Sequence, residues 1–169
     1  MELTLDNLVR RTTIGLTEDT DLAAWVEAHM PGKNLFQQLG NDPTSEIELD
    51  NCPAWAVFPG AEGRDAENMN YDIGIECRLR EEGYEVGENL PAAAAKVRVY
   101  RHPSKITQFA AAVRTAVDDI FRDTNAPVDS YEIGYDLFGT WPVVTALVKI
   151  KFKIPILLGS EVELPEEDE

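Results

Sequence analysis

The sequence predicts an α+β fold, in which a mostly antiparallel sheet of four to five strands packs against two amphipathic helices as a two-layer sandwich. Two observations predict it. Several segments alternate between apolar and polar residues, which is the repeat of a strand with one buried face. Two other segments repeat apolar residues at helical spacing. A sheet with one apolar face requires a second layer, and the two helices supply it.

The first predicted helix follows a cluster of helix-starting residues at 17–21. Leu22, Trp25 and Val26 follow at helical spacing, and Pro31 ends the helix. We expect a helix of about ten residues, which is a common length in globular proteins.

The stretches on either side of this helix are less regular. Residues 1–16 are treated as an N-terminal arm without assigned structure, although they contain Arg10 and Arg11. Residues 33–39 are expected to add a helical turn. Residues 46–50 alternate between acids and aliphatic residues, which indicates a short edge strand with its acids in solvent.

The middle of the chain predicts three strands and two loops. Residues 53–59 form an apolar run bounded by prolines, typical of a buried strand. A polar loop is expected at 60–70, and residues 71–80 then alternate as a strand with one polar face. A second polar loop is expected at 81–91, followed by a short strand at 96–101.

The second predicted helix spans residues 104–123, with Ser104 as its N-cap. One apolar stripe runs along it, formed by Ile106, Phe109, Ala110, Val113, Ala116, Val117, Ile120 and Phe121. Residues 131–137 alternate as another strand, and residues 138–142 turn the chain into the last strand.

The last strand, residues 143–154, carries the clearest alternation in the chain. Its inner face is apolar and comprises Val144, Ala146, Val148, Ile150, Phe152 and Ile154. Its outer face begins apolar and ends in lysines, in the order Val143, Thr145, Leu147, Lys149, Lys151 and Lys153. At roughly 3.3 Å per residue the strand spans about 40 Å, so we expect it to extend beyond its own domain. The three lysines, called the lysine stripe below, have two interpretations: a guard on an edge strand, or a salt-bridging contact to a neighbour.

Charge and composition limit the possible partners. The chain has 31 acids against 15 bases and a net charge of −16, which argues against nucleic-acid binding. We expect a single domain over residues 1–159, followed by an acidic C-terminal tail over residues 160–169. With no run of eighteen apolar residues and no signal-peptide pattern at the start, neither a membrane partner nor secretion is expected.

No motif in the chain predicts catalysis or a cofactor. The phosphate loop, the dinucleotide-binding glycine pattern, the serine-hydrolase elbow, the zinc-protease motif and the calcium loop are all missing. Cys52, Cys77, His29 and His102 lack the close pairs of ligands that a zinc site needs. We therefore expect no catalytic residue, metal or cofactor. A small cytoplasmic hydrolase or transferase that uses a cysteine and a histidine remains the alternative from another class.

Two portions of the chain carry a family likeness. The first comprises residues 53–60 and 71–79, and the second comprises residues 106–122, 131–138 and 141–152. In their order, their length and their pattern of apolar and polar residues, these segments resemble the tail terminator (tail completion) proteins of long-tailed bacteriophages. They are also similar to neck and other connector components of contractile machines, which form a second alternative.

The resemblance implies a virion protein of the tail or neck, assembled in the host cytoplasm. Such a subunit forms a ring of six, caps the tail tube, stops its polymerisation and joins it to the head connector. DNA passes through the ring without specific binding, and the family carries no catalytic residues. A head-to-tail ring needs two complementary patches on each subunit. Our hypothesis for these patches is the lysine stripe on one subunit and the acids of the tail on the next, namely Glu161, Glu163, Glu166 and Glu167.

Overall fold

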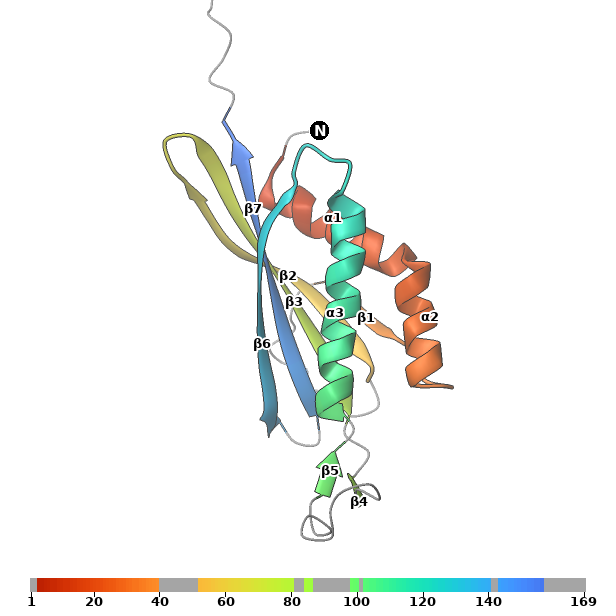
Figure 1. Cartoon of the computed structure of the whole chain (residues 1–169). Coiled ribbons are helices and arrows are strands. Elements are labelled where there is room, and N and C mark those ends of the chain that lie inside the picture. The colour runs from red at the N-terminus through yellow and green to blue at the C-terminus, as the bar shows by residue number, and fades with distance from the viewer. Residues whose placement is uncertain are drawn as a thin grey trace, which may run out of the picture.

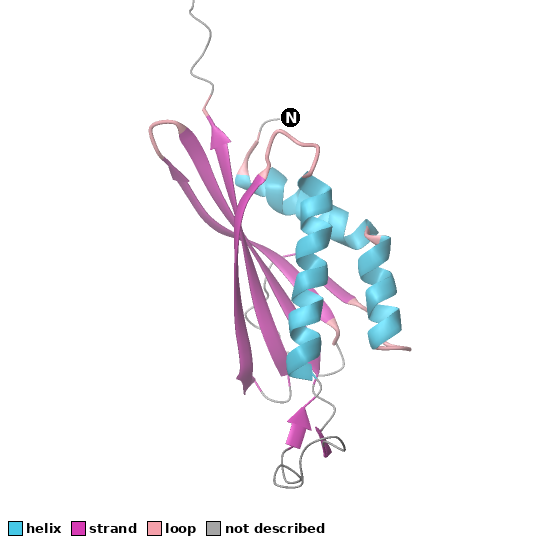
Figure 2. Ribbon diagram, in the orientation of Figure 1, coloured by secondary structure: helices cyan, strands magenta, loops and turns pink. Residues whose placement is uncertain are grey.

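A computed structural model of the chain describes residues 3–39, 52–80, 84–86, 98–100, 102–140 and 143–156. Within these ranges three helices lie against one face of a five-stranded sheet (Figures 1 and 2). The order of elements is α1 (Leu5–Glu18), α2 (Thr20–His29), β1 (Phe36–Leu39), β2 (Ala54–Arg64), β3 (Asn68–Arg80), β4 (Tyr84–Val86), β5 (Arg98–Tyr100), α3 (His102–Phe121), β6 (Val128–Thr140) and β7 (Val143–Pro155).

The five strands of the main sheet lie in the order β1-β2-β3-β7-β6. All neighbours are antiparallel except β1 and β2, which are parallel. The predicted α+β class and mostly antiparallel sheet are therefore confirmed. Among the described residues β4 and β5 pair with each other and not with the main sheet, so the strand predicted at 96–101 exists in part but lies outside that sheet.

Helix α1 occupies most of the stretch that the sequence left unassigned. Thr4 caps it, because its hydroxyl oxygen accepts a hydrogen bond from the Asn7 amide at 3.3 Å. The helix buries Leu8, Val9 and Leu16 against the core. The helical layer thus contains three helices rather than two.

Helices α2 and α3 were both predicted. The Asp19 carboxylate accepts a hydrogen bond from the Leu22 amide at 2.6 Å and caps α2. Helix α3 begins at His102, earlier than expected, so Ser104 lies inside its first turn and is not the N-cap. Pro103 fits this position because the first turn of a helix requires no amide donor. The predicted apolar stripe of α3 is buried except for Ile120, which is partly buried.

Strand β7 has the two faces that its alternation predicts. All six residues of its inner face are buried, from Val144 to Ile154, and the three lysines are exposed. However, β7 pairs with β3 on one side and with β6 on the other. It is an interior strand, so the interpretation of its lysines as an edge guard is wrong.

Residues 60–70, called the arm below, form a hairpin and not the predicted loop. β2 continues to Arg64, and β3 begins at Asn68. The prediction failed because Pro59 to Arg64 is exposed on both faces of the strand, so no buried face selects apolar residues there. The hairpin extends past the helical layer at the upper left of Figure 1, beside the end of β7.

Two further predictions concern short strands. The helical turn predicted at 33–39 is wrong, since Phe36–Leu39 is the strand β1 and pairs in parallel with residues 54–57. A parallel partner that lies fifteen or more residues away leaves no local signal. The edge strand predicted at 46–50 lies outside the described residues.

Candidate functional site

The arm is held in shape by the side chain of Asp65. One carboxylate oxygen, Oδ1, accepts hydrogen bonds from the amides of Glu67 and Asn68 at 2.9 and 2.7 Å. The other, Oδ2, accepts one from the Asn70 side-chain amide at 3.2 Å. An Asx turn of this kind orders a tight connection without any apolar core.

These hydrogen bonds favour the ionised form of Asp65. The amide of Glu67 contributes most, followed by the side chain of Asn70, and together they lower the pKa of Asp65 from 3.8 to about 2. The carboxylate is fully exposed, so the shift arises from hydrogen bonding and not from burial. The turn of the arm is thus charged at every physiological pH.

The last strand runs along the arm almost to its turn. β3 pairs with β7 along its whole length, from Asn68 opposite Pro155 to Arg80 opposite Val143. The Ile156 amide also donates a hydrogen bond to the Glu67 carbonyl at 2.7 Å. Residues 153–155 of β7 therefore pair with residues 68–70 of the arm. The length of the alternating segment 143–154 predicts such an extension.

The lysine stripe lies on the sheet face opposite the helices, and acidic residues flank it. Lys149 Nζ lies 4.0 Å from Glu132 Oε1 on β6, and both side chains are exposed. Lys151 lies opposite Asp72 of β3 in the strand register. Exposed pairs of this kind are worth at most about 1 kcal/mol. The stripe is therefore partly neutralised within its own sheet.

The predicted partners of the stripe, Glu161, Glu163, Glu166 and Glu167, lie outside the described residues. The contact between them stays a prediction.

Both cysteines are buried within the fold. Cys77 is fully buried on the helix-facing side of β3, and burial raises the pKa of its thiol well above the ordinary value. Burial also raises the pKa of Cys52. A thiolate nucleophile is disfavoured at both positions, because the thiol form is the one that a buried site favours.

The side-chain contacts of His29 are with Trp25 and not with either cysteine. His29 stacks on the Trp25 ring, and its Nδ1 lies 2.8 Å from the Trp25 carbonyl oxygen, at the end of α2. The side chain of His102 is outside the description. Among the described residues no group of three or more His, Cys, Asp and Glu side chains could hold a metal ion. Nor is any described helix both long and apolar enough to cross a membrane.

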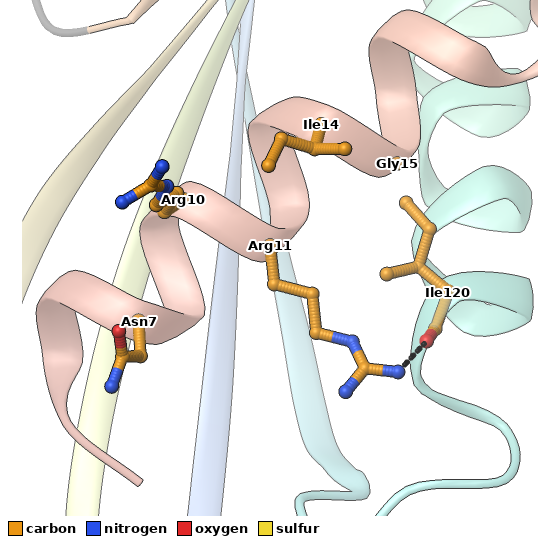
Figure 3. Close-up of a pocket in the computed structure, with 6 residues that line it drawn as sticks. All are labelled: Asn7, Arg10, Arg11, Ile14, Gly15 and Ile120. Atoms are coloured by element: carbon orange, nitrogen blue, oxygen red, sulfur yellow. Dashed lines mark hydrogen bonds between the residues drawn. The ribbon is translucent and has the colours of Figure 1, made fainter. Parts of the chain in front are cut away.

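A groove that the sequence did not predict lies between α1 and α3 (Figure 3). It has a volume of about 510 Å³. Asn7, Arg10, Arg11, Ile14 and Gly15 of α1 and Ile120 of α3 line it, and it is called the α1–α3 groove below.

Arg11 crosses this groove from one helix to the other. Its guanidinium donates a hydrogen bond to the Ile120 carbonyl at 3.4 Å and lies 5.6 Å from the centroid of the Phe121 ring. Both contacts place a cation at the C-terminal end of α3, where the helix dipole favours it. Arg10 is exposed and also lines the groove, but Figure 3 shows its side chain pointing away from Arg11 and Ile120, so it takes part in neither contact.

The α1–α3 groove could have been anticipated only in part. Residues 7, 10, 11 and 14 repeat at helical spacing, which is the available signal in the sequence. This spacing predicts a helix face with polar and cationic residues. The second wall of the groove belongs to α3, more than a hundred residues later in the chain.

Comparisons with known proteins give matches among solved structures. No family model matches the sequence, and no curated protein matches it. Fifteen chains of solved structures match. One of them belongs to a structure described as the virion of a native gene transfer agent (GTA) particle, with 13% identity and a TM-score of 0.40. The match covers 88% of this chain and 94% of that chain.

Proposed function

We propose that the chain is a structural, ring-forming subunit of a phage-like tail. In this proposal a ring of six subunits caps the tail tube, ends its polymerisation and joins it to the head connector. The observation that carries the proposal is the arm, a hairpin with both faces of its outer strand in solvent.

The arm contributes little to the domain that bears it. Residues 59–64 of β2 are all exposed, so their side chains add nothing to the hydrophobic core. Beyond Val57, β2 has no strand on its outer side among the described residues, because β1 pairs only with residues 54–57. A projecting strand with a free edge is a surface on which another chain can pair or pack.

A second free edge lies at the other end of the sheet. β6 is thirteen residues long and pairs only with β7 among the described strands. A closed ring of identical subunits needs two different surfaces that complement each other. The arm on one side and the edge of β6 on the other provide two such surfaces.

The charge of the chain and the resemblance of its sequence support the same role. With a net charge of −16, a ring of these subunits repels the phosphate backbone and lets DNA pass without binding it. The segments that resemble tail terminator proteins include β2, β3, α3 and β7, which form the centre of the fold. The cysteines are buried, which favours a structural role over the hydrolase alternative.

The arm provides the test. In one variant residues 60–70 are replaced by a two-residue turn, and circular dichroism verifies that the variant still folds. Light scattering after size-exclusion chromatography, together with negative-stain images, should show rings for the native chain and monomers for the variant. Only monomers from the native chain would contradict the ring. Rings from both forms would contradict the role of the arm.

The capping role has its own measurement. Purified protein added to polymerising tail tube protein should yield short tubes with a ring at one end in electron micrographs. Tubes that grow to the same length with and without the protein would contradict this part of the proposal.

A further inference from the structure

We propose that the α1–α3 groove is the docking site for the acidic segment 160–169 of a neighbouring copy of this chain. The inference rests on the ring proposed above and identifies one contact between its subunits. Charge, shape and the length of chain beyond β7 each support it.

The first argument is charge. Arg10 and Arg11 bring two cations to the lining of this groove, in a chain whose net charge is −16. Within the described residues neither arginine forms an ion pair with a carboxylate. Asp123 lines an adjoining hollow of about 300 Å³ together with Arg11. This part of the surface therefore attracts an acidic peptide that most of the molecule repels.

The second argument is the chemistry of the groove walls. Ile14 is 48% exposed, which is high for a large aliphatic side chain, and Ile120 forms the opposite wall. The groove thus has two apolar walls, and two arginines are also among its lining residues. Arginine binds carboxylates through paired N–H donors, which makes it well suited to an acidic ligand.

The acidic segment matches both features. Glu161 and Glu163 alternate with Val162 and Leu164, so an extended chain places its acids on one side and its apolar residues on the other. The remaining acids then follow at 166–169. In this orientation Val162 and Leu164 cover Ile14 and Ile120, while the glutamates face the arginines.

The third argument is reach. The described chain continues one residue past β7 and ends at Ile156, which lies beside Glu67 at the tip of the arm. Four residues, 157–160, lead from there to Glu161, and an extended chain of this length spans about 14 Å. Because the arm projects from the domain (Figure 1), the last described residue, Ile156, already lies on the side of the subunit from which a neighbour can be reached.

The lysine stripe is the competing acceptor for the same segment. It lies on a sheet face where Glu132 and Asp72 partly neutralise it. The α1–α3 groove lacks such carboxylates among its own lining residues. For these reasons we assign the segment to the groove and use the stripe as the matched control.

The experiment measures binding of a fluorescent peptide with the sequence of residues 160–169 to the chain truncated after Gly159. Fluorescence anisotropy should show saturable binding that weakens with salt. Arg10→Glu should weaken it at least about fivefold, because one attractive charge becomes repulsive. Lys151→Glu makes the same charge change at another exposed site and should leave the affinity unchanged. A peptide with serine at positions 162 and 164 should also bind less tightly.

Three results would overturn the docking site: no saturable binding, equal binding by Arg10→Glu and the parent, or loss of binding in Lys151→Glu alone. The last would place the segment on the lysine stripe. Arg11 is kept intact in these variants because it contacts Ile120 and Phe121. Light scattering of the full chain reports separately on the ring. A chain that stays monomeric while its groove binds the peptide would refute the ring and retain the groove.

Discussion

Gly15 of α1 faces the side chain of Ile120 of α3 at the point where the two helices meet. A Cβ atom at position 15 would lie 2.5 Å from both Cγ1 and Cδ1 of Ile120. The absence of a side chain on Gly15 therefore sets the distance between the helices, and with it the width of the α1–α3 groove.

Substitution of Gly15 should reveal this contact. We expect Gly15→Ala to lower the free energy of unfolding by about 1 kcal/mol, because overpacking outweighs the better helix propensity of alanine. In an Ile120→Ala background the clash is absent, so Gly15→Ala should instead stabilise by up to about 1 kcal/mol. Urea unfolding of the four forms measures both effects. Strictly additive changes would contradict the contact.

A second glycine contact lies on the opposite face of the sheet. A Cβ atom on Gly74 of β3 would lie 2.3 Å from Cε2 of the Phe58 ring, whereas one on Gly134 of β6 would meet nothing within 4 Å. We expect Gly74→Val to destabilise the protein by about 1–3 kcal/mol through overpacking. Gly134→Val is the matched control and should be neutral or slightly stabilising, since valine favours strands. Thermal unfolding compares the two. Equal losses would show that the ring of Phe58 does not lie over Gly74.

The turn of the arm should respond to acid in a defined range. The folded pKa of Asp65 is about 2, below its ordinary value of 3.8. The stabilising effect of its charge is therefore fully present above about pH 4 and is lost as the pH falls through 2. In an NMR titration, the amide signals of Glu67 and Asn68 should move with a midpoint near pH 2.

Asp65→Asn is the control for this titration. It keeps an acceptor oxygen but cannot ionise, so the two amide signals should no longer shift around pH 2. A midpoint near 4 in the native chain would show that the hydrogen bonds to Asp65 do not form in solution.

The cysteines should behave as core residues. Because burial raises the pKa of Cys77, a thiol reagent at neutral pH should leave it unmodified in the native protein and label it rapidly in denaturant. Cys77→Ser should cost about 1–3 kcal/mol, since it buries a hydroxyl among apolar side chains. Cys77→Ala is the control, which tests packing without adding a polar group. Rapid labelling of Cys77 in the native state would contradict its position and revive the cysteine-dependent alternative.

Sequence reasoning predicted strand faces well and strand neighbours poorly. The alternation from Val143 to Ile154 identifies which side chains are buried, because the backbone alone fixes that period. It gives no information on pairing, so the lysines of an interior strand had the pattern expected at an edge. The same limit applies to β1, whose parallel partner is remote in sequence.

Helix α1 and the arm were missed for different physical reasons. The helix contains Thr12, Thr13 and Gly15, which have low helix propensity, and packing against the core compensates for it. The arm has no buried face over residues 59–64, so the period-two signal is absent although the strand is present. Because α1 was not predicted, the α1–α3 groove was not predicted either. Arg10 and Arg11 line a groove only because α3 supplies its other wall.

The unbroken pairing of β3 with β7 gives the arm a mechanical property. Thirteen successive residue pairs join the two strands, from Asn68 next to the turn of the arm to Arg80 at the far end of the sheet. The β2 side of the hairpin, in contrast, has a register irregularity between Pro59 and Glu62. A pull on the arm along the strands therefore loads the whole β3–β7 ladder in shear at once. Force applied to the arm therefore passes into the domain. The domain cannot extend at this point unless β3 and β7 slide past each other.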